Sequence, residues 1–208
     1  MEIELKYAIA DKETSERIWN DPKLASMEEE DSREKLLMKA VYFDTEDFDL
    51  SRKDIAFRIR AEGERTVASL KWNGTNDGAL HTRQEINVPV SDDSCLILPD
   101  PSIFKESDVG MEVLEFIGDK QLLGIIEMTI MRKRLRVDTG KSIIEVSVDN
   151  GEIKTDKGIA PVCEVELELF TGNCDELLAL GECLAKTYGL QPEKRSKYAR
   201  GLALLEQK

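Results

Sequence analysis

Eight segments of the chain alternate between apolar and polar residues, and this alternation constrains the fold more than any other feature. Side chains along a β-strand point to opposite faces with a period of two, so each segment separates its apolar residues from its charged ones. The segments are "EIELK" (2–6), "VYFDT" (41–45), "IAFRIRA" (55–61), "TVASLKW" (66–72), "TRQEINVPV" (82–90), "IMRKRLRVD" (130–138), "SIIEVSVD" (142–149) and "VCEVELELF" (162–170). Turn-forming sequences such as "NGTNDG" (73–78) separate them, which predicts an antiparallel sheet.

One face of these strands is charged if each register is unbroken. It carries Glu2, Glu4, Lys6, Arg58, Arg60, Lys71, Arg83, Glu85, Arg132, Arg134, Arg136, Glu145, Asp149, Glu164, Glu166 and Glu168. An antiparallel sheet or sandwich could turn this face toward water around an apolar interior. A barrel could instead line its lumen with the same residues and cover its apolar exterior with helices. The alternation is the same in both arrangements, so periodicity alone leaves both open.

Helical apolar spacing predicts helices in 12–27, around 111–118, in 174–188 and in 196–207. The sequence "NDP" (20–22) is expected to break the first of these. Asn173 is a candidate N-cap and Gly189 a candidate C-terminal stop for the third helix, and Ser196 can cap the last one.

Length and charge limit the function. At 208 residues with 41% hydrophobic content, the chain is expected to form a single domain over 1–208. The 42 acidic and 29 basic residues give a formal charge of −13. This charge repels nucleic acid and anionic membrane surfaces, so we expect neither as a partner. A polyanionic ligand would need a basic pocket or a metal ion.

The cysteines and the N-terminal sequence point to a reducing, cytoplasmic setting. Cys95, Cys163, Cys174 and Cys183 show no Cys-x-x-Cys spacing and are expected to be reduced. No apolar signal segment or membrane span is apparent, so we expect a cytoplasmic protein. His81 is the single histidine and is given no role.

The segments occur in an order that resembles a known family. "EIELK" has the form Glu-x-Glu-x-Lys and is followed by "VYFDT", "FRIR", "SLKWNG", "TRQE", "EVSVDNGEI", "CEVELEL" and "SKYARGLAL". Together they resemble the CYTH superfamily, also called the triphosphate tunnel metalloenzymes, over essentially the whole chain. The resemblance implies a closed eight-stranded antiparallel β-barrel with flanking helices. It also implies a reaction, dependent on a divalent metal, at the triphosphate group of a small substrate.

The resemblance assigns roles to the charged face. Glu2, Glu4, Glu164 and Glu166 would hold Mg²⁺ or Mn²⁺, between which the sequence does not choose. The phosphate contacts would come from Lys6, Arg58, Arg60, Lys71, Arg83, Arg132, Arg134 and Lys197. Lys6 is also a catalytic candidate, and Glu85, Glu145 or Asp149 would orient the attacking water or a second metal. Arg136, Glu168 and Arg200 are left undecided between the site and its rim.

Several functions are compatible with this expectation. Hydrolysis of inorganic triphosphate is favoured because the inward residues are expected to be almost entirely charged. An organic triphosphatase, acting on thiamine triphosphate or a nucleoside triphosphate, would need an apolar platform, for which Trp19, Trp72 and Phe48 are candidates. Class IV adenylate cyclase activity is the third reaction. The fourth candidate is a non-catalytic polyphosphate-binding module, which would not need the metal-binding glutamates. The helix patterns are compatible with covering the barrel or with forming a homodimer interface.

Overall fold

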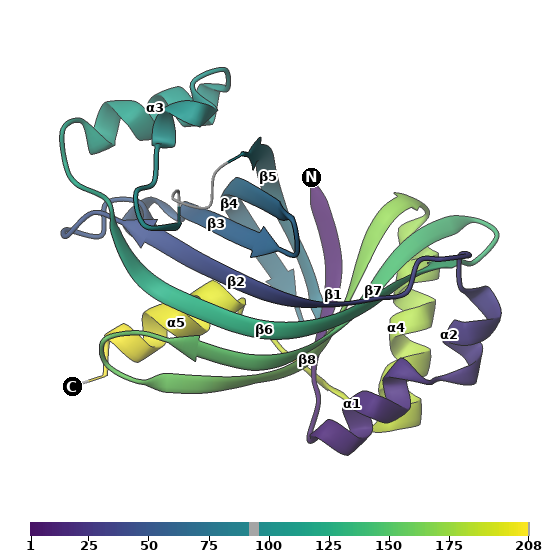
Figure 1. Ribbon diagram of the computed structural model, residues 1–208. Coiled ribbons are helices and arrows are strands. Elements are labelled where there is room, and N and C mark those ends of the chain that lie inside the picture. The colour runs from purple at the N-terminus through teal and green to yellow at the C-terminus, as the bar shows by residue number, and fades with distance from the viewer. Residues whose placement is uncertain (92–95, 208) are drawn as a thin grey trace.

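The computed structural model describes residues 1–91 and 96–207 and consists of one curved antiparallel sheet with helices around it (Figure 1). The strands are β1 (Glu2–Ala8), β2 (Glu34–Asp44), β3 (Ala56–Glu62), β4 (Arg65–Asp77), β5 (Leu80–Val90), β6 (Leu123–Asp138), β7 (Ser142–Lys154), β8 (Ile159–Gly172) and the short β9 (Gln191–Pro192). The α-helices are α1 (Lys12–Trp19), α2 (Pro22–Met27), α3 (Asp108–Ile117), α4 (Cys174–Tyr188) and α5 (Lys197–Leu205). Short 3-10 helices span Ser51–Lys53 and Pro101–Phe104.

Strands β1 to β8 close into a barrel, as the sequence predicted. Their order is β5-β4-β3-β2-β6-β7-β8-β1, and β1 pairs again with β5, with Glu2 opposite Arg83. On its other side β1 pairs with β8, with Glu4 opposite Glu168. Because closure leaves no free edge among these strands, their inward side chains share one lumen. β9 adds a short pairing to one end of β1.

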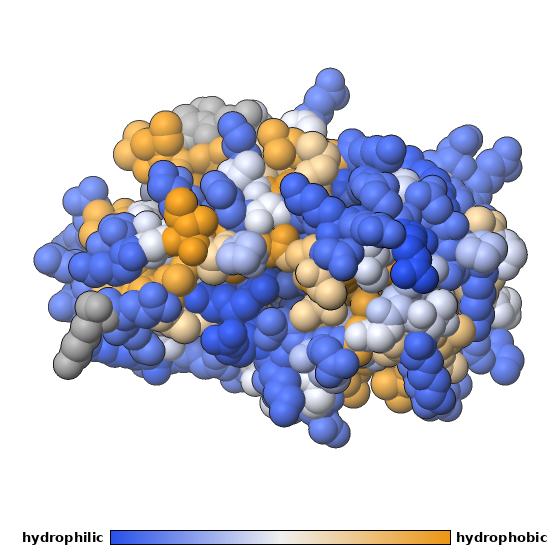
Figure 2. Space-filling view, turned by 90° about the horizontal axis from the view of Figure 1, so that it is seen from below, coloured by the Kyte–Doolittle hydropathy of each residue, from blue (hydrophilic) through white to orange (hydrophobic). Residues whose placement is uncertain are grey.

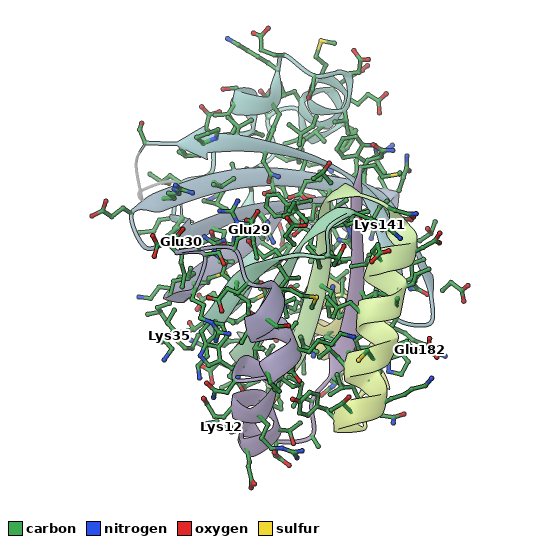
Figure 3. The ribbon with its side chains drawn as sticks, turned by 90° about the vertical axis from the view of Figure 1, so that its right-hand side faces the viewer. Lys12, Glu29, Glu30, Lys35, Lys141 and Glu182 are labelled. Carbon is green, nitrogen blue, oxygen red and sulfur yellow. The ribbon has the colours of Figure 1, made fainter. Side chains whose placement is uncertain are left out.

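Helices cover the apolar outer face of the barrel in two places. Helices α1, α2 and α4 lie along one side, and exposed charged residues such as Lys12 and Glu182 point away from the sheet (Figure 3). Beneath them Leu5, Val146 and Leu167 are buried against helix residues that include Leu180. Helix α3 covers a second outer core, in which Phe57, Ile59 and Leu70 of the sheet join Phe104 and Val113.

The predicted helix ends are confirmed by their caps. α1 stops at Trp19, and α2 begins after Asp21, whose side chain accepts a hydrogen bond from the Leu24 N–H. Pro22 fits the first turn of α2 because that position needs no N–H donor. Asn173 and Ser196 cap α4 and α5. Gly189 ends α4 with φ 66°, a left-handed conformation that glycine adopts without strain.

Helix α5 packs against a different part of the sheet. The rings of Tyr198 and Tyr42 stack with centroids 4.8 Å apart. Leu204 is buried in the same core, which contains Met38, Met128 and Ile130 from the inward face of β2 and β6. This packing places the first turn of α5 beside the lumen, next to β7 and β8.

Several strands are longer than expected, and β4 continues through most of the predicted turn 73–78, as far as Asp77. β2 begins at Glu34 rather than Val41, and β6 begins at Leu123 rather than Ile130. In both added stretches most inward residues are apolar, as with Met38 and Met128, so a search for a charged inward face does not find these stretches.

The surface fits the acidic composition. Figure 2 shows a face that is mostly hydrophilic, with apolar residues in separate patches. Within the described residues, no helix is both long and apolar enough to cross a membrane. Cys163, Cys174 and Cys183 are free thiols, as predicted, whereas Cys95 lies outside the described residues.

Candidate active site

The barrel encloses a cavity of about 80 Å³, which has room for several water molecules. It is lined by Glu2, Glu4, Lys6, Met38, Ala40, Tyr42, Arg58, Arg60, Lys71, Arg83, Met128, Ile130, Arg132, Glu166, Glu168, Ser196 and Lys197. Most of the residues predicted for the site are in this set, and they come from six strands and from α5. The fold therefore brings together side chains that are far apart in the sequence.

The first strand contributes a buried ion pair. The Lys6 ammonium lies 2.9 Å from Glu4 Oε1 and 3.3 Å from Glu166 Oε1. Burial opposes the charge of this lysine, but Glu4 and Glu166 outweigh burial and raise the pKa of Lys6. Lys6 therefore remains a cation inside the barrel, and its ammonium links two neighbouring strands.

Lys71 on β4 joins two further carboxylates. Its Nζ is 2.9 Å from Glu2 Oε1 and 2.9 Å from Glu85 Oε2. Burial raises the pKa of Glu85, but Lys71 and Arg58 outweigh it and lower this pKa to about 2. Glu85 does not line the cavity. Its carboxylate is therefore a weak base that fixes Lys71 in place.

Arg132 and Lys197 hold a cluster of three carboxylates, Asp149, Glu164 and Glu166, whose oxygens lie within 4.8 Å of one another. Arg132 donates Nε–H and NH2 hydrogen bonds to the two oxygens of Asp149, at 2.7 and 2.6 Å. The Lys197 Nζ lies 2.8 Å from both Asp149 and Glu166 and also contacts Glu164. Arg200 on Glu164 and Lys6 on Glu166 add two more basic groups that offset the charge of the cluster, although burial still raises the pKa of Glu164.

Glu168, left undecided from the sequence, lines the cavity without a partner. In the described part of the chain, no group forms an ion pair or hydrogen bond with its carboxylate. Burial, with the nearby carboxylates Glu2 and Glu4, raises the pKa of Glu168 to about 7. A buried carboxylate without a counter-charge is costly. A divalent cation bound in the cavity would supply positive charge near Glu168.

Two cavity arginines retain unused donors, whereas the Nε of a third, Arg60, lies 2.6 Å from Glu62 Oε1 in an ion pair. The Nε–H groups of Arg58 and Arg83 are buried, and they find no hydrogen-bond acceptor among the described residues. Buried donors are normally satisfied. A ligand rich in acceptor oxygens could satisfy both of these groups.

One wall of the cavity corrects the sequence interpretation. The inward residues were expected to be almost entirely charged, but Met38, Ala40, Tyr42, Met128 and Ile130 also line the cavity. They come from β2 and β6, which are neighbours in the barrel. The alternation in "VYFDT" places Tyr42 on the opposite face of the strand from Val41 and Phe43. No sequence signal showed that this face was the lumen.

Other predicted residues lie beyond the cavity lining. Glu145 is 3.8 Å from Arg134, which also contacts Glu34 and Glu62 at one mouth of the barrel. Glu164 is fully buried behind Lys197. Arg200 contacts Glu164 and so belongs to the support of the site. Arg136 is half exposed and pairs with Glu29 at 3.3 Å, outside the cavity.

A second cavity, at the side, adjoins the main one. Its volume is about 110 Å³, and Lys71, Arg83 and Ser196 line both cavities. Trp72 and Tyr198 add aromatic surface to the side cavity. Of the aromatic candidates from the sequence, Trp72 is therefore next to the site. Trp19 is instead packed in the outer core under α1.

Comparisons with known proteins bear on the family and the fold of the chain. The family model of the CYTH domain matches residues 1–202. An inorganic triphosphatase of Haemophilus influenzae is 29% identical over 208 residues, covering 98% of this chain and 54% of that protein. The chain thus spans about half the length of this relative.

Solved structures share the fold. A putative adenylyl cyclase from Hippeastrum, described as having a dominant triphosphatase activity, has a TM-score of 0.70 at 20% identity and covers 98% of this chain and 96% of its own. A putative adenylate cyclase from Bacillus halodurans has a TM-score of 0.60 at 20% identity, covering 96% of each chain. The triphosphatase of the Mimivirus capping enzyme has a TM-score of 0.51 at 11% identity, covering 88% of this chain and 87% of its own.

Proposed function

Because the chain belongs to the CYTH-domain family, we propose that it hydrolyses inorganic triphosphate inside the barrel with the help of a divalent metal ion. The observation that carries this proposal is the convergence of Arg58, Arg60, Lys71, Arg83 and Arg132 on one cavity that also contains glutamates. The similarity to the Haemophilus inorganic triphosphatase supports the choice of substrate.

The charge balance of the lumen favours a metal. The lining has seven cations and four carboxylates, and three carboxylates behind it, Glu85, Asp149 and Glu164, pair with Lys71, Arg132 and Lys197, so a polyanion would enter a lumen whose cations are already largely compensated. Glu2, Glu4 and Glu166 of the cavity would hold Mg²⁺ or Mn²⁺, with Glu168 beside them and Glu164 behind. The bound ion would neutralise phosphate oxygens and lower the pKa of a bound water.

The protein groups have separate tasks in this proposal. The free Nε–H groups of Arg58 and Arg83 would bind phosphate oxygens, with charge-assisted hydrogen bonds. Lys6 and Lys197 would stabilise charge that develops on the transferring phosphoryl group. Glu85 and Asp149 would hold Lys71 and Arg132 in position. Glu145 stays a prediction as a group that orients water.

Organic triphosphates form the second candidate substrate class. The aromatic side cavity next to Lys71 and Arg83 favours it, because an organic group attached to a phosphate chain could lie against Trp72 or Tyr198. Class IV cyclase activity would use the same cavities, with a ribose hydroxyl as nucleophile. In the main cavity a bare triphosphate would contact cations such as Arg58, Lys71 and Arg83 without needing the side cavity.

A substrate panel tests the proposal. Phosphate release would be measured from inorganic triphosphate, ATP and thiamine triphosphate, each with Mg²⁺ and with Mn²⁺, and ATP reactions would be analysed by chromatography for cyclic AMP. We expect kcat/KM to be highest for inorganic triphosphate and to fall to background when the metal is chelated. A preference for thiamine triphosphate, or cyclic AMP as the main product from ATP, would overturn the choice of substrate.

A further inference from the structure

Helix α5 carries a basic residue of the site but packs against the apolar wall. Lys197 in its first turn reaches the carboxylates of Asp149 and Glu166, each at 2.8 Å. Arg200 contacts Glu164 from the same helix. Both contacts depend on the distance between α5 and the sheet. The carboxylates belong to β7 and β8, so they do not move with the helix.

Two residues of the sheet form the seat for α5. Tyr42 stacks on Tyr198, and Ile126 lies directly opposite Tyr42 in the β2–β6 register. Ile126 is fully buried. The helix rests on this pair of neighbouring side chains, so its distance from the sheet is set there.

Gly201 is the helix residue that faces Ile126. A Cβ atom at this position would lie 2.6 Å from Ile126 Cδ1, 2.8 Å from Cγ2 and 2.9 Å from Cγ1. Carbon atoms in contact prefer separations of about 3.5–4.0 Å. Ile126 cannot rotate away easily because it is β-branched and surrounded by other side chains. Gly201 is in the helix interior, so it is the missing side chain that matters here.

We propose that Gly201 is a positioning residue for the triphosphatase reaction: by letting α5 touch Ile126, it places Lys197 among the three carboxylates. Lys197 and Gly201 are four residues apart and share one face of the helix, so a displacement at Gly201 is transmitted to Lys197. The inference rests on the proposed function for its kinetic test, but the position of Lys197 can be measured separately.

The substitution Gly201→Ala should favour the helical conformation of α5 locally but disturb the packing of α5 on the sheet. Helix propensity alone favours alanine over glycine. The contact with Ile126 instead requires α5 to move outward by about 1 Å, a displacement that can cost roughly 100-fold in rate at a catalytic site. We expect kcat/KM for inorganic triphosphate to fall at least about tenfold. Unchanged kcat/KM would overturn the proposal.

A double-mutant cycle separates positioning from general damage. If Gly201 acts through Lys197, Gly201→Ala should change activity by less than about twofold in a Lys197→Met background, because the group it places is already gone. An equal loss in both backgrounds would show that Gly201 does not act through Lys197, and the proposal would fail.

Removing the Ile126 atoms that obstruct a Cβ at residue 201 should let α5 keep its position against the sheet. Ile126→Ala deletes all three atoms that a Cβ at residue 201 would meet. With Ile126→Ala as the reference, adding Gly201→Ala should keep kcat/KM within about threefold. A tenfold loss in this background as well would contradict the steric argument.

Chemical labelling tests the geometry without activity. Lys197 is 11% exposed in its side chain and should react slowly with acetic anhydride. Gly201→Ala should raise its labelling roughly fivefold, because local opening controls access to a buried group, while labelling of Lys6 stays unchanged. Gly158→Ala is the matched control, since a Cβ there meets only Leu204 Cδ2 at 3.9 Å. If the protein shows no triphosphatase activity, the proposed function fails, and slow labelling in Gly201→Ala would independently overturn the positioning role.

Discussion

The inward face of β6 changes character along a single strand. Near α5 it presents Met128 and Ile130, which are buried with the helix, and two residues further on it presents Arg132. Arg132 forms ion pairs with Asp149 and Glu166. The apolar half supports a helix and the charged half forms a site, although both follow the same alternation. A period of two thus identifies which residues share a face, but not what that face contacts.

The two halves also respond differently to change. Apolar side chains of similar volume can replace one another because their contacts are non-directional. Paired buried charges cannot, because losing one partner leaves the other desolvated and uncompensated. We therefore expect large, specific effects from substitutions in the charged half and small effects from conservative ones in the apolar half.

The largest effect is expected from Glu4→Gln, which keeps the size of the side chain but removes an anionic ligand. Metal-dependent turnover should fall by roughly 100-fold or more, because the stabilisation that a bound metal gives the transition state is several kcal/mol. Steady-state rates over a metal titration would measure this loss, and circular dichroism would confirm that the fold is intact. Near-normal turnover at limiting metal would remove Glu4 from the proposed metal ligands.

An intermediate effect is expected from Glu168→Gln on stability in EDTA. The raised pKa of about 7 means that the folded metal-free protein binds a proton there more tightly than the unfolded chain does. The stability that this proton contributes is present below about pH 4.5 and is lost as pH rises through 7. The variant should therefore be more stable than the natural protein at pH 8, by up to about 3 kcal/mol, and similar to it at pH 4.5.

Urea unfolding at the two pH values checks this expectation. Glu85→Gln is a suitable contrast, because the pKa of Glu85 is lowered and its carboxylate is paired with Lys71. That variant should be less stable than the natural protein at pH 8. Equal stability of Glu168→Gln and the natural protein at pH 8 would mean that Glu168 has a counter-charge in solution.

The smallest effect is expected from Met128→Leu in the apolar half. The volume is nearly conserved, so the free energy of unfolding should fall by less than about 1.5 kcal/mol. The kcat/KM for inorganic triphosphate should change by no more than about twofold, because no polar contact is lost. Thermal unfolding and phosphate release measure the two quantities. A tenfold loss of activity would show that the apolar wall takes part in the reaction itself.

Much of the fold could be predicted from the sequence. Charged and apolar residues alternate along the barrel strands with a period of two, and helix caps such as Ser196 are recognisable in the sequence. The sequence also placed Arg58 and Lys71 at the cavity, because their segments matched a family pattern. The partner of each charge could not be predicted. Whether Glu164 faces the cavity or lies behind Lys197 depends on how β8 meets α5, and that contact has no local signal.

Closure through β1 has a consequence for biosynthesis. This strand leaves the ribosome before its partners β5 and β8, so its pairing is non-local and must wait until β8 has been made. During that interval β1 is an open strand edge, the kind of segment that invites intermolecular pairing. Glu2, Glu4 and Lys6 are then exposed charges, which oppose such pairing. The residues proposed to bind metal and phosphate in the finished barrel are thus also charges that disfavour intermolecular pairing of the unpaired strand.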